Sequence, residues 1–176
     1  MTRKRWLLLL GVATVAFNLA LALIDRRLQA TGGPSILGLE FAGSARRVGE
    51  IEAEWGAHGR DLARLSLWLD FAFMLAYGAF LALAAFATRD FARCRDLPAL
   101  AAGGVVAPFL AIAAALFDAA ENISWLILLG GHGGSALPVF ATACAYAKFA
   151  TVGLAIAYLL WGLLARLTQL RASPSR

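Results

Sequence analysis

Four long apolar blocks separate the charged segments of this sequence, and they limit its possible folds more than any other feature. They cover about 6–24, 65–87, 101–129 and 137–164. A nearly uncharged run of about 18 or more residues is long enough to cross a bilayer as a helix, and a helix satisfies its own backbone hydrogen bonds in lipid. The blocks therefore predict an all-α fold, an integral membrane four-helix bundle that forms a single domain over residues 1–176.

The composition favours a membrane protein over a soluble domain. Apolar residues make up 61% of the 176 residues and the mean hydropathy is +0.72, whereas a soluble domain has about 45–50% apolar residues. The net charge is +5, but the basic residues gather at the ends of the predicted spans and are not interleaved with aromatic residues as in nucleic-acid-binding proteins. We therefore expect membrane lipid as a partner, and no nucleic acid.

Basic residues in the short flanks predict the orientation of the bundle. The N-terminus, the loop 88–98 and the C-terminal tail are rich in lysine or arginine, and the loop 130–136 has neither. We expect a multi-pass protein of the inner (plasma) membrane with both termini in the cytoplasm. The segment 25–64 carries six arginines and six acids, and it is placed outside because four spans leave no better solution.

The first span also has features of a cleaved signal peptide, namely a basic start, an apolar stretch and small residues at 20–22. Its apolar stretch is longer than a usual signal core, which favours a retained span. The segment 44–55 predicts an amphipathic helix in the first outer loop, because Val48, Ile51 and Trp55 recur at helical spacing. We expect this helix to lie on the bundle or at the membrane surface.

Polar and ionisable side chains interrupt spans two to four, and they form the candidate binding pocket. These side chains are Asp70, Tyr77, Asp118, Glu121, Asn122, Tyr146 and Lys148. At about 1.5 Å per helical residue, they lie roughly 8–18 Å below the outer ends of their spans. A charged side chain near the bilayer centre costs at least about 2.5–3.5 kcal/mol. We therefore predict that the set converges inside the bundle, in a pocket open to the outside.

The charges of this set do not balance. Asp70, Asp118 and Glu121 together carry three negative charges against the single positive charge of Lys148, and the ammonium can pair fully with one carboxylate. Burial disfavours the charged form of an unpaired carboxylic acid. We expect at least one carboxyl to be protonated near neutral pH, with Glu121 as the first candidate, or a cation or outside water to compensate.

Several of these residues also have a purely structural interpretation. Tyr77 and Tyr146, together with a lysine–aspartate pair, can simply hold helices together. His58 and His132 are interpreted as loop residues, although a His–carboxylate metal site would arise if they folded over the acids. The sequence gives no cofactor motif, and we expect neither a metal nor a cofactor.

Three sets of short strings resemble those of small bacterial four-span membrane proteins of unassigned activity. The strings are Leu69-Asp70-Phe71 with Tyr77-Gly78, Phe117-Asp118-Ala119-Ala120-Glu121-Asn122, and Leu39-Glu40-Phe41-Ala42-Gly43 with Trp55-Gly56. The resemblance covers about 36–125 and implies no activity. The chain is also similar, more weakly, to the EXPERA family of sterol isomerases and sigma-2-type receptors. That analogy implies a lipid-like ligand, with Asp25 and Asp70 as counterparts of the embedded acids there, and it does not include the Asp118–Asn122 motif.

Three functions remain open from the sequence. The first is a protein that binds or transports a cation, a proton-coupled solute or an amphiphile through the embedded acids. The second is a membrane enzyme that acts on a lipid with Asp118 and Glu121 as acid and base, although no nucleophile elbow or phosphate loop accompanies them. The third is an accessory or scaffolding subunit, in a homo-oligomer or with a membrane partner, because small residues such as Ala111 and Ala115 permit close helix contact.

Overall fold

The computed structural model describes residues 2–172, and that part of the chain is almost entirely helical. Its helices are α1 (Arg3–Gln29), α2 (Ile36–Glu40), α3 (Ala45–Cys94), α4 (Pro98–Leu129) and α5 (Ala136–Ala172). The helices α1, α3, α4 and α5 are each long and apolar enough to cross a membrane. The predicted all-α architecture with four spans is confirmed.

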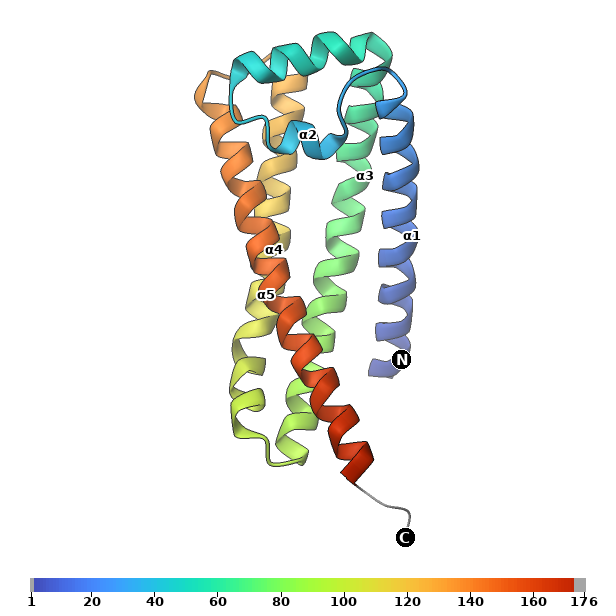
Figure 1. Ribbon diagram of the computed structural model, residues 1–176, viewed down its shortest axis with the longest axis vertical. Helices are drawn as coiled ribbons and strands as arrows, with labels where there is room; N and C mark the ends of the chain where they lie inside the picture. Colours follow the sequence, from blue (N-terminus) through green and yellow to red (C-terminus); the bar gives the residue numbers. More distant parts are fainter. Residues whose placement is uncertain (1, 173–176) are drawn as a thin grey trace.

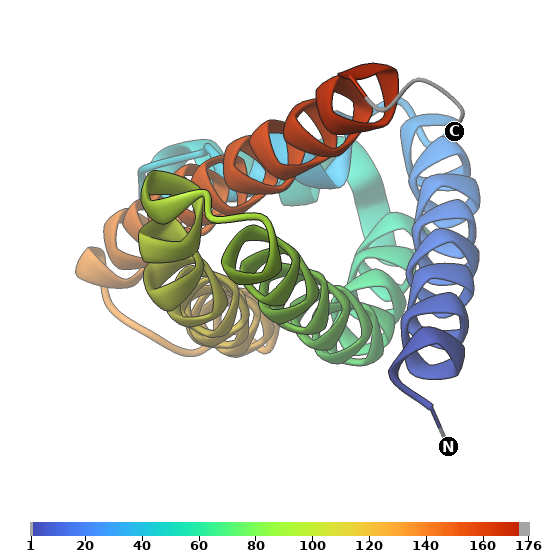
Figure 2. The ribbon, with the colours of Figure 1, turned by 90° about the horizontal axis from the view of Figure 1, so that it is seen from below.

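The four long helices stand side by side, and α2 with the first turns of α3 closes one end (Figure 1). The start of α1 and the end of α5 lie at the opposite end. Helix α3 packs along both α1 and α4, and α4 packs along α5. Seen from below, α3 separates α1 from α4 (Figure 2). Helix α1 scarcely touches α5, so the bundle is not closed on that side.

Helix α3 consists of two helical segments that meet at Gly56. This glycine has φ 63° and ψ −166°, a backbone conformation that a residue with a Cβ rarely adopts. The segment before it lies across the end of the bundle (Figure 1), with Val48, Ile51 and Trp55 buried. The predicted amphipathic helix is therefore confirmed. The spanning segment starts directly after Gly56, eight residues earlier than the predicted start at Leu65, because its first two turns are polar.

Hydrogen bonds fix the short helix α2 at both of its ends. The Asp25 carboxylate of α1 accepts a bond of 2.7 Å from the Ile36 amide. At the other end, the Thr142 hydroxyl of α5 donates to the Glu40 carbonyl at 2.8 Å and accepts from the Gly43 amide at 3.1 Å. Because α1 and α5 both bind it, α2 is held over the gap between them, and its last residue points into the bundle end.

Glycines allow the long helices to approach closely at the end that carries the termini. A Cβ placed on Gly162 of α5 would collide with the Thr88 Cγ2 of α3. No heavy atom outside its own helical turn lies within 4 Å of a Cβ placed on Gly153, on the same helix. Gly162 is therefore a packing requirement, and Gly153 serves as its matched control.

We predict that Gly162→Ala lowers the stability of the folded protein by about 1–3 kcal/mol, the usual range for overpacking a tight contact. The measurement is thermal or denaturant unfolding in detergent micelles. Gly153→Ala should be neutral or slightly stabilising, and Thr88→Ala added to Gly162→Ala should restore most of the loss. Equal effects of the two glycine substitutions would contradict the close α3–α5 contact.

Candidate functional site

The ammonium of Lys148 lies among three carboxyl groups from other helices. Its Nζ is 2.8 Å from Glu121 Oε2, 3.1 Å from Asp118 Oδ1 and 3.3 Å from Glu40 Oε2. The exposed fraction of each of these four residues is 8% or less. One cation thus joins α2, α4 and α5 at a point that is largely shielded from solvent.

Two hydrogen bonds extend this network to α3. The Tyr77 hydroxyl donates to Asp118 Oδ2 at 2.9 Å. The Asn122 amide donates to Asp70 Oδ2 at 2.7 Å. Asp70 is partly exposed and makes no ion pair with Lys148 within 4 Å, so its charge is the least compensated of the set.

The placement of the acids follows from the helical period of α4. Asp118, Glu121, Asn122 and Trp125 lie at positions i, i+3, i+4 and i+7, which share one face of a helix, and all four are buried. The Trp125 indole donates to Glu121 Oε1 at 3.4 Å. Small residues on the facing side of α5, such as Ala141 and Ala145, are also fully buried and let the helices approach.

Six of the seven residues predicted for the pocket come together in this network. They are Asp70, Tyr77, Asp118, Glu121, Asn122 and Lys148. Tyr146 does not join them: it is 63% exposed, and its ring packs 5.1 Å from the ring of Phe41. Tyr146 precedes Lys148 by two residues, a rotation of about 200° on a helix, so an inward Lys148 forces Tyr146 outward.

Sequence reasoning missed Glu40 as a member of the cluster. Burial raises the pKa of the Glu40 carboxyl above its usual value of 4.5, repulsion from Asp118 adds to the rise, and attraction to Lys148 partly offsets it. The sequence did contain a signal, because Glu40 lies within the short apolar stretch 36–41, where an acid that faces water is not expected.

A groove of about 600 Å³ leads away from the cluster between α1 and α5. Its polar end is formed by Glu40, Asp70, Asp118 and Lys148. Apolar side chains from α3 and α5 line most of the remainder, namely Phe73, Phe80, Leu81, Phe149, Val152, Ile156 and Leu159. Helix α1 contributes Thr14, Asn18 and Leu21 to its other side. The groove therefore has one acidic end and a long apolar wall.

The two histidines lie away from this cluster. His58 and His132 are both exposed. Within the described part of the chain, no group of three or more His, Cys, Asp or Glu side chains is arranged to hold a metal ion. The polar chemistry of the site is thus that of carboxyl groups, one ammonium, one phenol and one amide.

We predict that Lys148→Met destabilises the protein by about 3–5 kcal/mol, because it leaves buried carboxylates without their cation. Unfolding in detergent micelles measures the effect. The deficit should shrink at acid pH, where the carboxyls take up protons instead. Lys4→Met removes the same charge from an exposed position and should have little effect. A Lys148→Met protein as stable as the wild type would contradict the ion network.

We predict that the stability of Glu40→Gln relative to wild type increases as the pH rises above about 4.5. A carboxyl whose pKa is raised by folding favours the folded state below its unfolded pKa and loses that contribution as the pH passes its folded pKa. Melting temperatures of both proteins between pH 4.5 and 8 measure the difference. The control is Glu50→Gln, on the exposed face of α3. If the difference in melting temperature between wild type and Glu40→Gln did not change with pH, a raised pKa of Glu40 would be excluded.

Comparison with known proteins provides no template for this site. No family model, no curated protein and no solved structure matches the chain. The geometry of the described residues is therefore the basis for the function proposed below.

Proposed function

We propose that this protein binds an amphiphile with a positively charged head group in the groove between α1 and α5. The observation that carries the proposal is the excess of carboxyl groups over cations at one end of an apolar groove. The head group would lie against the acids, and the chain would lie along the apolar wall.

The charge of the cluster favours a cationic ligand. Glu40, Asp70, Asp118 and Glu121 oppose the single ammonium of Lys148, which gives a net charge of −3 if all five groups ionise. Lys148 already contacts three carboxyls and is not available to an anionic head group. The hydrogen-bond partner of Asp70 is a neutral amide. A ligand cation beside Asp70 would therefore neutralise the carboxylate whose charge the network compensates least.

The wall of the groove favours a ligand with an apolar chain over a bare ion. A volume of about 600 Å³ falls within the usual range of small-molecule sites, about 300–1,000 Å³. The centroid of the Phe149 ring lies 4.9 Å from Lys148 Nζ, so an aromatic side chain of the apolar wall directly borders the polar end. Because α1 scarcely touches α5, a lipid-like molecule would enter sideways from the membrane.

The proposed orientation follows the basic flanks. Arg3, Lys4 and Arg5, together with the basic segment 88–98 at the junction of α3 and α4, belong to the end opposite the cluster, and such flanks prefer the cytoplasm. The acidic end of the groove would then lie in the outer half of the plasma membrane, with both termini inside. Cation binding favours the ionised form of a neighbouring carboxyl, so ligand binding would release protons and tighten as the pH rises.

The test uses the protein in phosphatidylcholine nanodiscs and three probes: dodecyltrimethylammonium, tetramethylammonium and dodecyl sulfate. We expect saturable binding of the first, at least about tenfold weaker binding of the second and none of the third. Asp70→Asn should weaken dodecyltrimethylammonium binding by at least about tenfold, or about 1.4 kcal/mol. Thermal stabilisation or calorimetry gives the dissociation constants.

Asp61→Asn provides the matched control, because Asp61 is an exposed acid on the same helix. It should leave the dissociation constant unchanged. If tetramethylammonium bound as tightly as dodecyltrimethylammonium, the ligand would be a bare cation. If dodecyl sulfate bound equally well, or if Asp70→Asn bound dodecyltrimethylammonium as tightly as wild type, the proposal would be refuted.

A further inference from the structure

Two arginines from different helices meet at the end of the bundle that carries the termini. Arg89 lies near the end of α3, and Arg166 lies near the end of α5. The Arg166 Nη2 donates to the Ala87 carbonyl at 3.1 Å, and its Cζ lies 4.9 Å from the centroid of the Phe91 ring. Both arginines are partly buried, so their charges are only partly solvated.

In the part of the chain that the structure describes, neither of these guanidinium groups forms an ion pair. Among the described residues, no carboxylate lies within 4 Å of Arg89 or Arg166. The acid next to Arg89 in the sequence, Asp90, pairs instead with Arg3. The excess of positive charge at this end of the bundle therefore comes from arginines of the packed helices α3 and α5, and not from the basic C-terminal tail alone.

The phenol of Tyr158 lies beside these arginines. Tyr158 is 8% exposed, and its hydroxyl is buried with no hydrogen-bond partner in the described part of the chain. A Cβ on Gly104 would lie 2.5 Å from this hydroxyl and 2.5 Å from Arg89 Cβ, so the phenol and the base of Arg89 meet over that glycine. Arg89 Nε and Arg166 Nε are buried and unpartnered as well.

Three unpartnered buried donors together are unfavourable, since each such group costs about 1–3 kcal/mol. A phosphate group offers several acceptor oxygens and a negative charge, and guanidinium–phosphate bonds are among the strong hydrogen bonds of proteins. Basic sites between spanning helices on the cytoplasmic side are suited to anionic lipid head groups. The chemistry of the donors therefore selects a phosphate.

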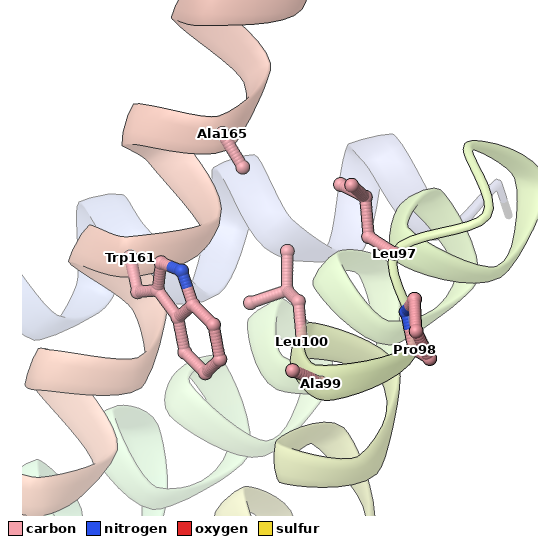
Figure 3. A pocket seen from close by; sticks show the side chains of 6 residues that line it. All are labelled: Leu97, Pro98, Ala99, Leu100, Trp161 and Ala165. Atoms are coloured by element: carbon pink, nitrogen blue, oxygen red, sulfur yellow. The ribbon is translucent and has the colours of Figure 1, made fainter.

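An apolar groove adjoins the same corner and indicates that the phosphate belongs to a lipid. It encloses about 180 Å³ and is lined by Leu97, Pro98, Ala99, Leu100, Trp161 and Ala165. Figure 3 shows Trp161 and Ala165 of α5 facing the first residues of α4. A Cβ on Gly103 would lie 3.1 Å from the Tyr158 ring and 3.9 Å from Trp161, so Gly103 of α4 packs between the phenol ring and a residue that lines the groove.

We infer that Arg89, Arg166 and Tyr158 bind the phosphate of an anionic phospholipid, with the start of an acyl chain in the groove beside Trp161. The site lies at the opposite end of the bundle from the carboxyl cluster and does not depend on the cationic ligand proposed above. Its lipid would join the ends of α3 and α5 and complete the hydrogen bonding of the buried donors.

Native mass spectrometry and thermal unfolding in detergent, with added lipid, test this inference. Phosphatidylglycerol should bind saturably and stabilise the protein, phosphatidylcholine should bind at least about tenfold more weakly, and inorganic phosphate should not stabilise it. A tenfold loss corresponds to about 1.4 kcal/mol. The combined substitution Arg89→Gln and Arg166→Gln should abolish the preference for phosphatidylglycerol, and Tyr158→Phe should reduce it without any change of charge.

The matched control is Arg93→Gln with Arg95→Gln, which removes the same charge from two exposed arginines at the C-terminal end of α3. It should retain the preference for phosphatidylglycerol. An equal loss in the control would reveal general surface charge instead of a site, and equal stabilisation by inorganic phosphate would exclude the lipid. If the double arginine variant does not fold, the lipid comparison on wild type and on Tyr158→Phe still decides between these outcomes.

Discussion

The ammonium of Lys148 is the interaction on which the arrangement of this bundle depends. A single cation 2.8–3.3 Å from three carboxyls allows acids from α2 and α4 to remain buried, where an isolated charge is costly. It also sets the rotation of α5, since burial of Lys148 fixes which face meets α4. Removal of one partner from such a network is far more damaging than its net contribution to stability suggests.

The gap between α1 and α5 is the route by which the proposed ligand would reach this network. Leu28 is the buried residue of α1, so this helix is attached to the bundle mainly along α3 and at its last turn. The short helix α2 bridges the resulting gap, and hydrogen bonds from Asp25 and Thr142 hold it there. Helix α2 covers the polar end of the groove and also brings Glu40 to Lys148. The same position of α2 therefore closes the bundle end and completes the carboxyl cluster.

The number of spans, the amphipathic helix and the meeting of six predicted residues in one network were predictable, because apolar length and helical period determine them locally. The period places Asp118, Glu121 and Asn122 on one face of α4 whatever that helix packs against. The same period, applied to residues two apart, would have excluded Tyr146. Glu40 was not predictable in this way, because its position depends on how α2 folds back over α5 through contacts more than 100 residues apart in the chain. The arginine–phenol corner depends likewise on the packing of α5 against Gly104.

A double-mutant cycle between Lys148 and Glu121 tests the shared interior most directly. Lys148→Met, Glu121→Gln and the double variant are unfolded in the same detergent, and their free energies of unfolding are compared with wild type. Groups in one buried network are expected to couple by about 0.5–3 kcal/mol, with the double variant more stable than the sum of the single losses predicts. Additive losses, within about 0.3–0.5 kcal/mol, would show that the two side chains do not meet and would remove the basis of the carboxyl cluster.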